Sequence, residues 1–173
     1  MALPMQGIVL LGSATVLVVA SGIDLRTRRV PNWLSVPFLV IGLVVQSIAG
    51  KLPGTGQSLA GIAVAGVLFG IPCWIGAMGM GDLKLAAGVG AWIGPGQFLT
   101  ASIFIALAGG VLAVGWALWH GSLGASLDSA GSLLTPWVRS PGSGRKVRQA
   151  TAATAIPYAP AIAIGTLLSF LAR

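Results

Sequence analysis

The sequence predicts an all-α integral membrane protein with about six transmembrane helices. Hydrophobic residues make up 55% of the 173-residue chain and charged residues only 8%, and the mean hydropathy is +0.93. A soluble domain usually carries about 25% charged residues, so these values exclude an ordinary soluble enzyme. The apolar residues also gather in runs, and a helix that crosses a bilayer needs about 20 of them. We expect one membrane domain over residues 1–173.

The first two apolar runs are separated by a basic loop. Leu3–Ile23 is the first run, and no Lys or Arg precedes Arg26, so the positive segment of a signal peptide is missing and a retained span is expected. The polar loop from Asp24 to Asn32 follows. The second run is Trp33–Ala49, and it is closed by the glycines and proline of Gly50–Gly54.

Four further runs complete the pattern. The third run ends at a Gly-x-Gly-Asp sequence, the fourth stops at Gly94-Pro95-Gly96, and a loop of about 35 small and basic residues separates the fifth from the sixth. The expected spans cover residues 3–23, 33–49, 58–78, 82–93, 98–119 and 155–171.

The fourth run is short for a span, and a re-entrant segment is the alternative. The distribution of Lys and Arg favours a full crossing. With six spans, only Lys51 and Arg173 lie outside, and all other basic residues fall on the cytoplasmic side. We therefore expect both termini outside. The net charge of +7 reflects this orientation rather than nucleic-acid binding.

Only three residues carry a carboxylate: Asp24, Asp82 and Asp128. Asp24 ends the first span and Asp82 begins the fourth, so both are expected at the cytoplasmic boundary. An ionisable group in a membrane segment costs roughly 2.5–3.5 kcal/mol, which makes it a candidate functional residue. Ionising both of two carboxyl groups at a similar depth in the membrane is unfavourable, so the pair shares a proton. Such a pair can activate water for attack on an amide bond.

Each aspartate also has a structural interpretation. Asp24 can pair with Arg28, one helical turn further on. Asp82 can be the N-cap of the fourth helix. Asp128 lies in a Ser/Gly/Ala-rich loop, where a solvated side chain is expected. The single cysteine, Cys73, provides neither a disulfide nor a paired CxxC zinc site.

Three motifs together resemble the prepilin peptidases. Asp24-Leu25-Arg26-Thr27-Arg28-Arg29-Val30-Pro31-Asn32 is similar to their first aspartate motif, with basic residues and a final [IV]-P-N. Gly79-Met80-Gly81-Asp82-Leu83-Lys84-Leu85 resembles their GxGDxKL motif. Ile156-Pro157-Tyr158-Ala159-Pro160-Ala161 is similar to their P-Y-x-P-A segment. The motifs follow the family's order, and the similarity covers essentially the whole chain.

The resemblance implies a GxGD-type intramembrane aspartic protease of the bacterial inner membrane. Such enzymes cleave the short basic leader of type IV pilin precursors at the cytoplasmic face. By motif, Asp24 and Asp82 are the catalytic pair. The residues implied to shape the site or bind substrate are Gly79, Gly81, Lys84, Pro157, Tyr158 and Pro160.

The resemblance also implies partners and cofactors. The expected partners are Flp-like prepilin precursors, membrane lipid and, as a further candidate, the pilus assembly machinery. Many family members carry a methyltransferase domain with paired CxxC motifs, which residues 1–173 lack. We therefore expect the short form of the tight-adherence (Flp) branch, with no methyltransferase activity and no need for S-adenosylmethionine, zinc or another cofactor.

Two other functions remain open at this point. A small proton-coupled carrier would also need membrane carboxylates, although such residues usually lie near the midplane of a repeated fold. A non-catalytic membrane subunit of a pilus or secretion apparatus is the other alternative, and the presence of both aspartates argues against it.

Overall fold

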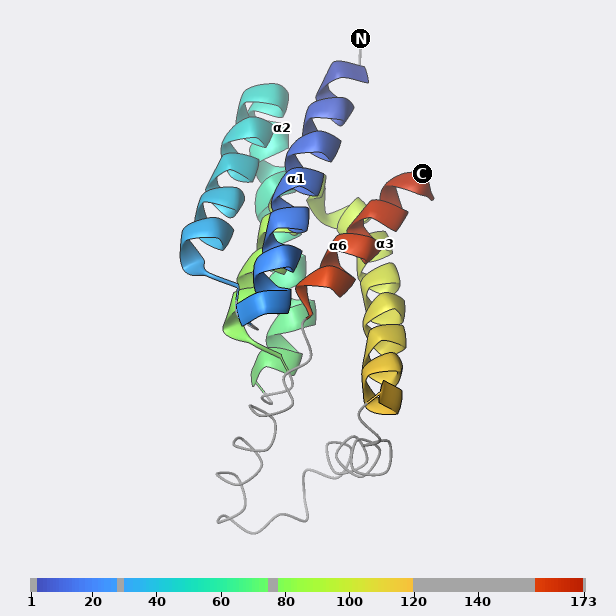
Figure 1. Cartoon of the computed structure of the whole chain (residues 1–173). Coiled ribbons are helices and arrows are strands. Elements are labelled where there is room, and N and C mark those ends of the chain that lie inside the picture. The colour runs from blue at the N-terminus through green and yellow to red at the C-terminus, as the bar shows by residue number, and fades with distance from the viewer. Residues whose placement is uncertain (1–2, 28–29, 75–77, 120–157, 173) are drawn as a thin grey trace. The chain divides into compact units, whose positions relative to one another are not determined.

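The computed structural model describes residues 3–27, 30–74, 78–119 and 158–172 (Figure 1). The regular elements in these ranges are all helices, which confirms the all-α prediction for this part of the chain. They are α1 (Leu3–Thr27), α2 (Asn32–Trp74), α3 (Met80–Trp119) and α6 (Ala159–Leu171). The first three contain stretches long and apolar enough to cross a membrane, and α6 is a shorter apolar helix.

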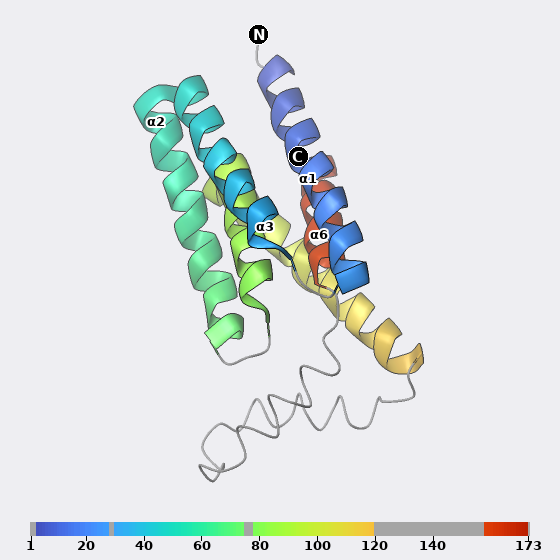
Figure 2. The ribbon, with the colours of Figure 1, turned by 60° about the vertical axis from the view of Figure 1, so that its left-hand side comes forward.

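Two backbone breaks divide the longest helices. Lys51 has φ 53° and ψ −138° within α2, and Gly94 has φ 74° and ψ 173° within α3. Glycine adopts a positive φ most readily. Gly94 does so in α3, whereas in α2 the residue with positive φ is Lys51, directly after Gly50. Figure 2 shows the second arm of α2 running back beside the first and α3 changing direction along its length. α2 and α3 therefore each consist of two helical arms.

Side chains of α2 satisfy the backbone near the break in α3. Pro95 has no N–H, so the carbonyl of Ala91 four residues earlier loses its usual helical donor. The hydroxyl of Ser58 donates to this carbonyl at 2.9 Å, and Nε2 of Gln46 donates to the carbonyl of Trp92 at 2.6 Å. Both arms of α2 are thereby tied to the same point of α3, where Ala91 and Trp92 are buried and an unpaired carbonyl would be unfavourable.

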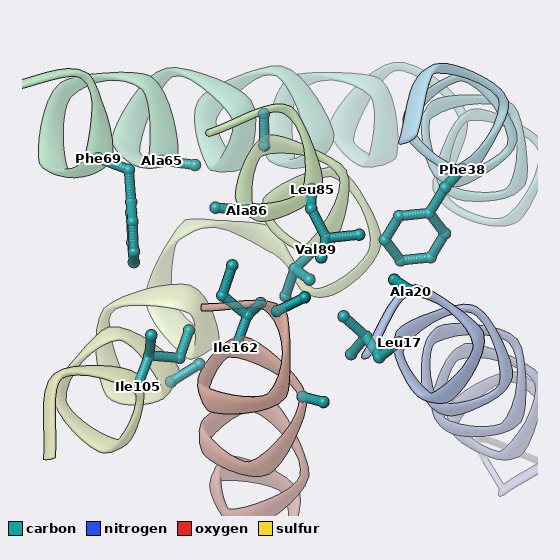
Figure 3. Packing of buried hydrophobic residues seen from close by; sticks show 14 of the residues in the cluster. Leu17, Ala20, Phe38, Ala65, Phe69, Leu85, Ala86, Val89, Ile105 and Ile162 are labelled. Carbon is teal, nitrogen blue, oxygen red and sulfur yellow. The ribbon is translucent and has the colours of Figure 1, made fainter. Parts of the chain in front are cut away.

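The chain divides into two compact units, residues 1–109 with 157–173, and residues 110–156. All packing considered below lies within the first unit. Its core forms around the first arm of α3, where Leu85 and Val89 are fully buried (Figure 3). Leu17 of α1, Phe38 of α2 and Ile162 of α6 pack into the same cluster.

Small residues allow the helices of this unit to approach closely. Gly61 of α2 and Gly90 of α3 lie backbone against backbone. The ring of Trp92 lies against Gly12 and Gly42, and its Nε1 donates to the carbonyl of Phe38 at 2.9 Å. Close approach at glycine is typical of helix packing in membranes, where burial of apolar area provides little driving force.

The outer surface of the described helices is strongly apolar. Ile48, Leu52 and Trp74 are more than three quarters exposed, the last at 89%. A soluble protein seldom exposes apolar surface on this scale, whereas lipid solvates it well. The structure therefore agrees with an integral membrane protein that has several apolar helices.

Candidate functional site

Asp24 lies in the last turn of α1 and not in the loop that the sequence predicted. α1 continues past the apolar run to Thr27. Its side chain is only 3% exposed, and Oδ2 accepts the backbone N–H of Ala159 at 3.0 Å. Ala159 is the first residue of α6, whose N-cap Tyr158 makes no side-chain capping bond. Asp24 therefore supplies an acceptor that the start of α6 needs.

Asp82 lies in the first turn of α3, and its side chain is partly buried. The helix begins at Met80, so the expectation that Asp82 is the N-cap residue is wrong in position. Gly79 precedes the helix, and the Asp82 carboxyl group folds back onto the backbone of Gly79. An acidic side chain at the third helical position that reaches back in this way resembles one half of a capping box.

The glycines of the Gly-x-Gly-Asp sequence leave room for neighbouring groups. A Cβ on Gly79 would lie 3.2 Å from Oδ2 of Asp82. A Cβ on Gly81 would lie 2.8 Å from the carbonyl oxygen of Val30 and 3.2 Å from its Cβ. Val30, in the segment between α1 and α2, therefore packs directly on the backbone that precedes Asp82.

Lys84 contacts the first motif rather than an aspartate. Its Nζ donates to Oδ1 of Asn32, the first residue of α2, at 2.9 Å. Asn32 and Val30 were not among the predicted site residues. The signal was the Val30-Pro31-Asn32 ending of the first motif, but only the fold brings this ending to the start of α3.

The remaining predicted residues lie at the start of α6 or outside the described residues. Tyr158 is partly buried, and its hydroxyl lies against Gly109 of α3. Pro160 is near the start of α6, where proline is tolerated. Pro157 and Asp128 lie outside the described residues, as does Arg28, the predicted partner of Asp24.

Three polar side chains interact electrostatically where three helices meet. They are Asp24 at the end of α1, Asp82 in the first arm of α3 and Tyr158 just before α6. The charges of Asp24 and Asp82 are close enough to affect each other, and Tyr158 is close enough to interact with Asp82. Two neighbouring carboxylates in a weakly solvated environment can divide the acid and base roles of a hydrolytic reaction. Within the ranges the structure describes, no group of three or more His, Cys, Asp or Glu side chains is placed to hold a metal ion.

Comparison with known proteins gives one family match. Residues 11–114 match the model of the type IV leader peptidase family. The chain is similar to a prepilin leader peptidase/N-methyltransferase of Xanthomonas campestris pv. campestris, with 36% identity over 107 residues, which cover 58% of this chain and 37% of the relative. It is also similar to proteins of the same name from Escherichia coli strain K12 and Burkholderia pseudomallei.

The Escherichia coli relative is 35% identical over 97 residues, covering 53% of this chain and 43% of the relative. The Burkholderia pseudomallei relative is 33% identical over 121 residues, covering 65% of this chain and 38% of the relative. The chain thus spans about two fifths of the length of the curated relatives it matches. No solved structure gives a significant match.

Proposed function

The chain belongs to the type IV leader peptidase family, and from this membership we propose that it is a membrane-embedded aspartic endopeptidase for type IV prepilins. The proposed reaction removes the short basic leader of Flp-like prepilins at the cytoplasmic face of the inner membrane. The relatives named as prepilin leader peptidases support the substrate class. The Flp-like type rests on the resemblance of the motifs.

The observation that carries the proposal is the electrostatic proximity of Asp24 and Asp82. They are the only carboxylates in the described part of the chain, and they come from different helices, α1 and α3. We propose that the pair activates a water molecule, which attacks the scissile amide carbonyl while the pair returns a proton to the leaving nitrogen. Because the two groups would titrate together, neither role is assigned to one residue.

The proposed membrane topology has six transmembrane spans. The breaks at Lys51 and Gly94 are compatible with it because they divide α2 and α3 into four arms. With both termini outside, the end of α1 and the start of α3 would share the cytoplasmic boundary, where a leader peptide is accessible. Lys and Arg in the intervening loops would then follow the positive-inside rule.

The proposed site includes residues around the two carboxylates. Gly79 and Gly81 would shape the site, because the absence of their side chains leaves room for the Asp82 carboxyl group and for Val30. Pro157, Tyr158 and Pro160 would line the approach from the start of α6, which already contacts Asp24 through Ala159. Only cleavage is attributed to residues 1–173, which hold one cysteine and so cannot provide paired CxxC motifs.

Co-expression of the protein with a tagged Flp-like prepilin tests this proposal. Mass spectrometry of the precursor should detect loss of the leader and identify the new N-terminus. A precursor that keeps its leader in cells containing abundant, membrane-inserted protein would contradict the proposal. Stable capture of the precursor without cleavage would instead favour a non-catalytic subunit, and proton-driven uptake into vesicles would favour a carrier.

A further inference from the structure

Lys84 is the basic residue of the second motif, and its side chain binds a residue outside that motif. It follows Asp82 by two positions on α3, and residues with this spacing do not face each other on a helix. Its ammonium group donates to Oδ1 of Asn32 at 2.9 Å. The charge of Lys84 is therefore used to hold the start of α2.

A second contact joins the same two segments. Val30 is only 7% exposed and packs on Gly81, whose absent side chain leaves the space that the Val30 backbone fills. The segment from Val30 to Asn32 thus contacts α3 on both sides of Asp82, at Gly81 and at Lys84. We call these two contacts the clasp.

The clasp links the chain that carries one aspartate to the helix that carries the other. Asp24 is fixed at the end of α1 by its bond to Ala159, and Val30 follows six positions later. Asp82 lies in the first turn of α3, where a helix is most prone to fray. Contacts on both sides of Asp82 would restrict that fraying and keep the carboxyl group at a fixed distance from Asp24.

We propose that Lys84 is a positioning residue, which acts through Asn32 to hold the Asp82 carboxyl group at a fixed distance from that of Asp24. It touches neither the substrate nor the reacting atoms. The inference rests on the proposed function, since the distance between the two carboxyl groups matters only if the two aspartates act together. A misplacement of about 1 Å in a catalytic group can lower a rate by about a hundredfold, so a bond at the edge of the site can control turnover.

A double-mutant cycle tests the proposal with purified protein in detergent and a fluorogenic prepilin leader peptide. The variants are Lys84→Met, Asn32→Leu and the double variant. Each single variant should lower kcat about tenfold and change KM less than about twofold, since binding groups stay in place. The double variant should be no slower than the slower single variant, because both changes remove the same bond.

Conservative variants separate positioning from general stability. Lys84→Arg and Asn32→Asp each keep the donor–acceptor pair, and each should retain at least about half of the wild-type kcat. Lys51→Met removes a lysine at the break in α2, away from the clasp, and should leave kcat unchanged. Melting temperatures of all variants show whether a rate loss reflects unfolding.

Several results would overturn the proposal. A double variant about a hundredfold slower would show that the two residues act independently. A Lys84→Met defect confined to KM would assign the lysine to substrate binding, and wild-type rates in that variant would remove its role altogether. If the wild-type protein itself does not cleave the peptide, both the proposed function and the positioning role fail. If the wild-type protein cleaves but the two single variants have additive effects on kcat, only the positioning role fails.

Discussion

The carboxylate of Asp24 accepts the backbone N–H of Ala159 at 3.0 Å, although 135 positions separate the two residues. The bond fixes the end of α1 to the start of α6, and it occupies one of the acceptor positions of a side chain that is nearly inaccessible to solvent. Asp24 therefore supports the fold as well as the proposed chemistry. Replacements of this residue should separate the two roles.

Asp24→Asn should fold almost normally, because its amide oxygen can still accept the N–H of Ala159. Asp24→Leu should lower the free energy of unfolding by about 1–3 kcal/mol, since it leaves a buried N–H without a partner. Thermal unfolding in detergent would compare the two variants with the wild-type protein. Equal melting temperatures for Asn and Leu would show that the bond contributes little to stability.

Asp24→Asn and Asp82→Asn should each reduce leader cleavage at least about a hundredfold, because an amide cannot exchange the proton that the pair must move. The measurement is the fraction of prepilin processed during co-expression, read by mass spectrometry and normalised to the amount of membrane-inserted protein. Asp128→Asn is the matched control and should process normally. Normal processing by either Asp24→Asn or Asp82→Asn would rule out the dyad.

Gly61→Ala should destabilise the protein by about 1–3 kcal/mol, because the new methyl group would meet the backbone of Gly90 across the α2–α3 contact. Gly66→Ala in the same arm is its control, since a Cβ there has no neighbour within 4 Å. The second variant should be as stable as wild type or up to about 1 kcal/mol more stable, because alanine favours helix. Thermal unfolding that ranks the two variants the other way would contradict the packing described above.

Ser58→Ala should lower the free energy of unfolding by about 1 kcal/mol or more. The carbonyl of Ala91 would lose the hydroxyl donor that compensates for Pro95. Ser102→Ala is the control, because that hydroxyl bonds only to the carbonyl of Leu99 in its own helix, at 2.7 Å, and its loss should change stability by less than about 0.5 kcal/mol. Similar melting temperatures for both variants would mean that water or a relaxed backbone satisfies the break.

Local sequence features predicted the all-helical fold class and the positions of the two breaks in the longest helices. The apolar runs predicted helices, and Gly50 and the Gly94-Pro95 pair lie at or beside the two breaks, because glycine and proline act on the backbone near their own positions. The bond from Ala159 to Asp24 was not predicted, because it joins residues 135 positions apart. The Lys84–Asn32 bond could likewise not be predicted from the sequence, because only tertiary packing brings those positions together.

The bond between Asp24 and Ala159 also has a consequence for biogenesis. During synthesis, α1 leaves the ribosome long before residue 159 exists, so a partly made chain holds Asp24 without its backbone partner. The arrangement around Asp24 is therefore complete only after α6 has been synthesised and has packed against α1. Under the proposed function, only fully translated molecules would cleave a prepilin, so the synthesis of α6 would determine when the protein becomes active.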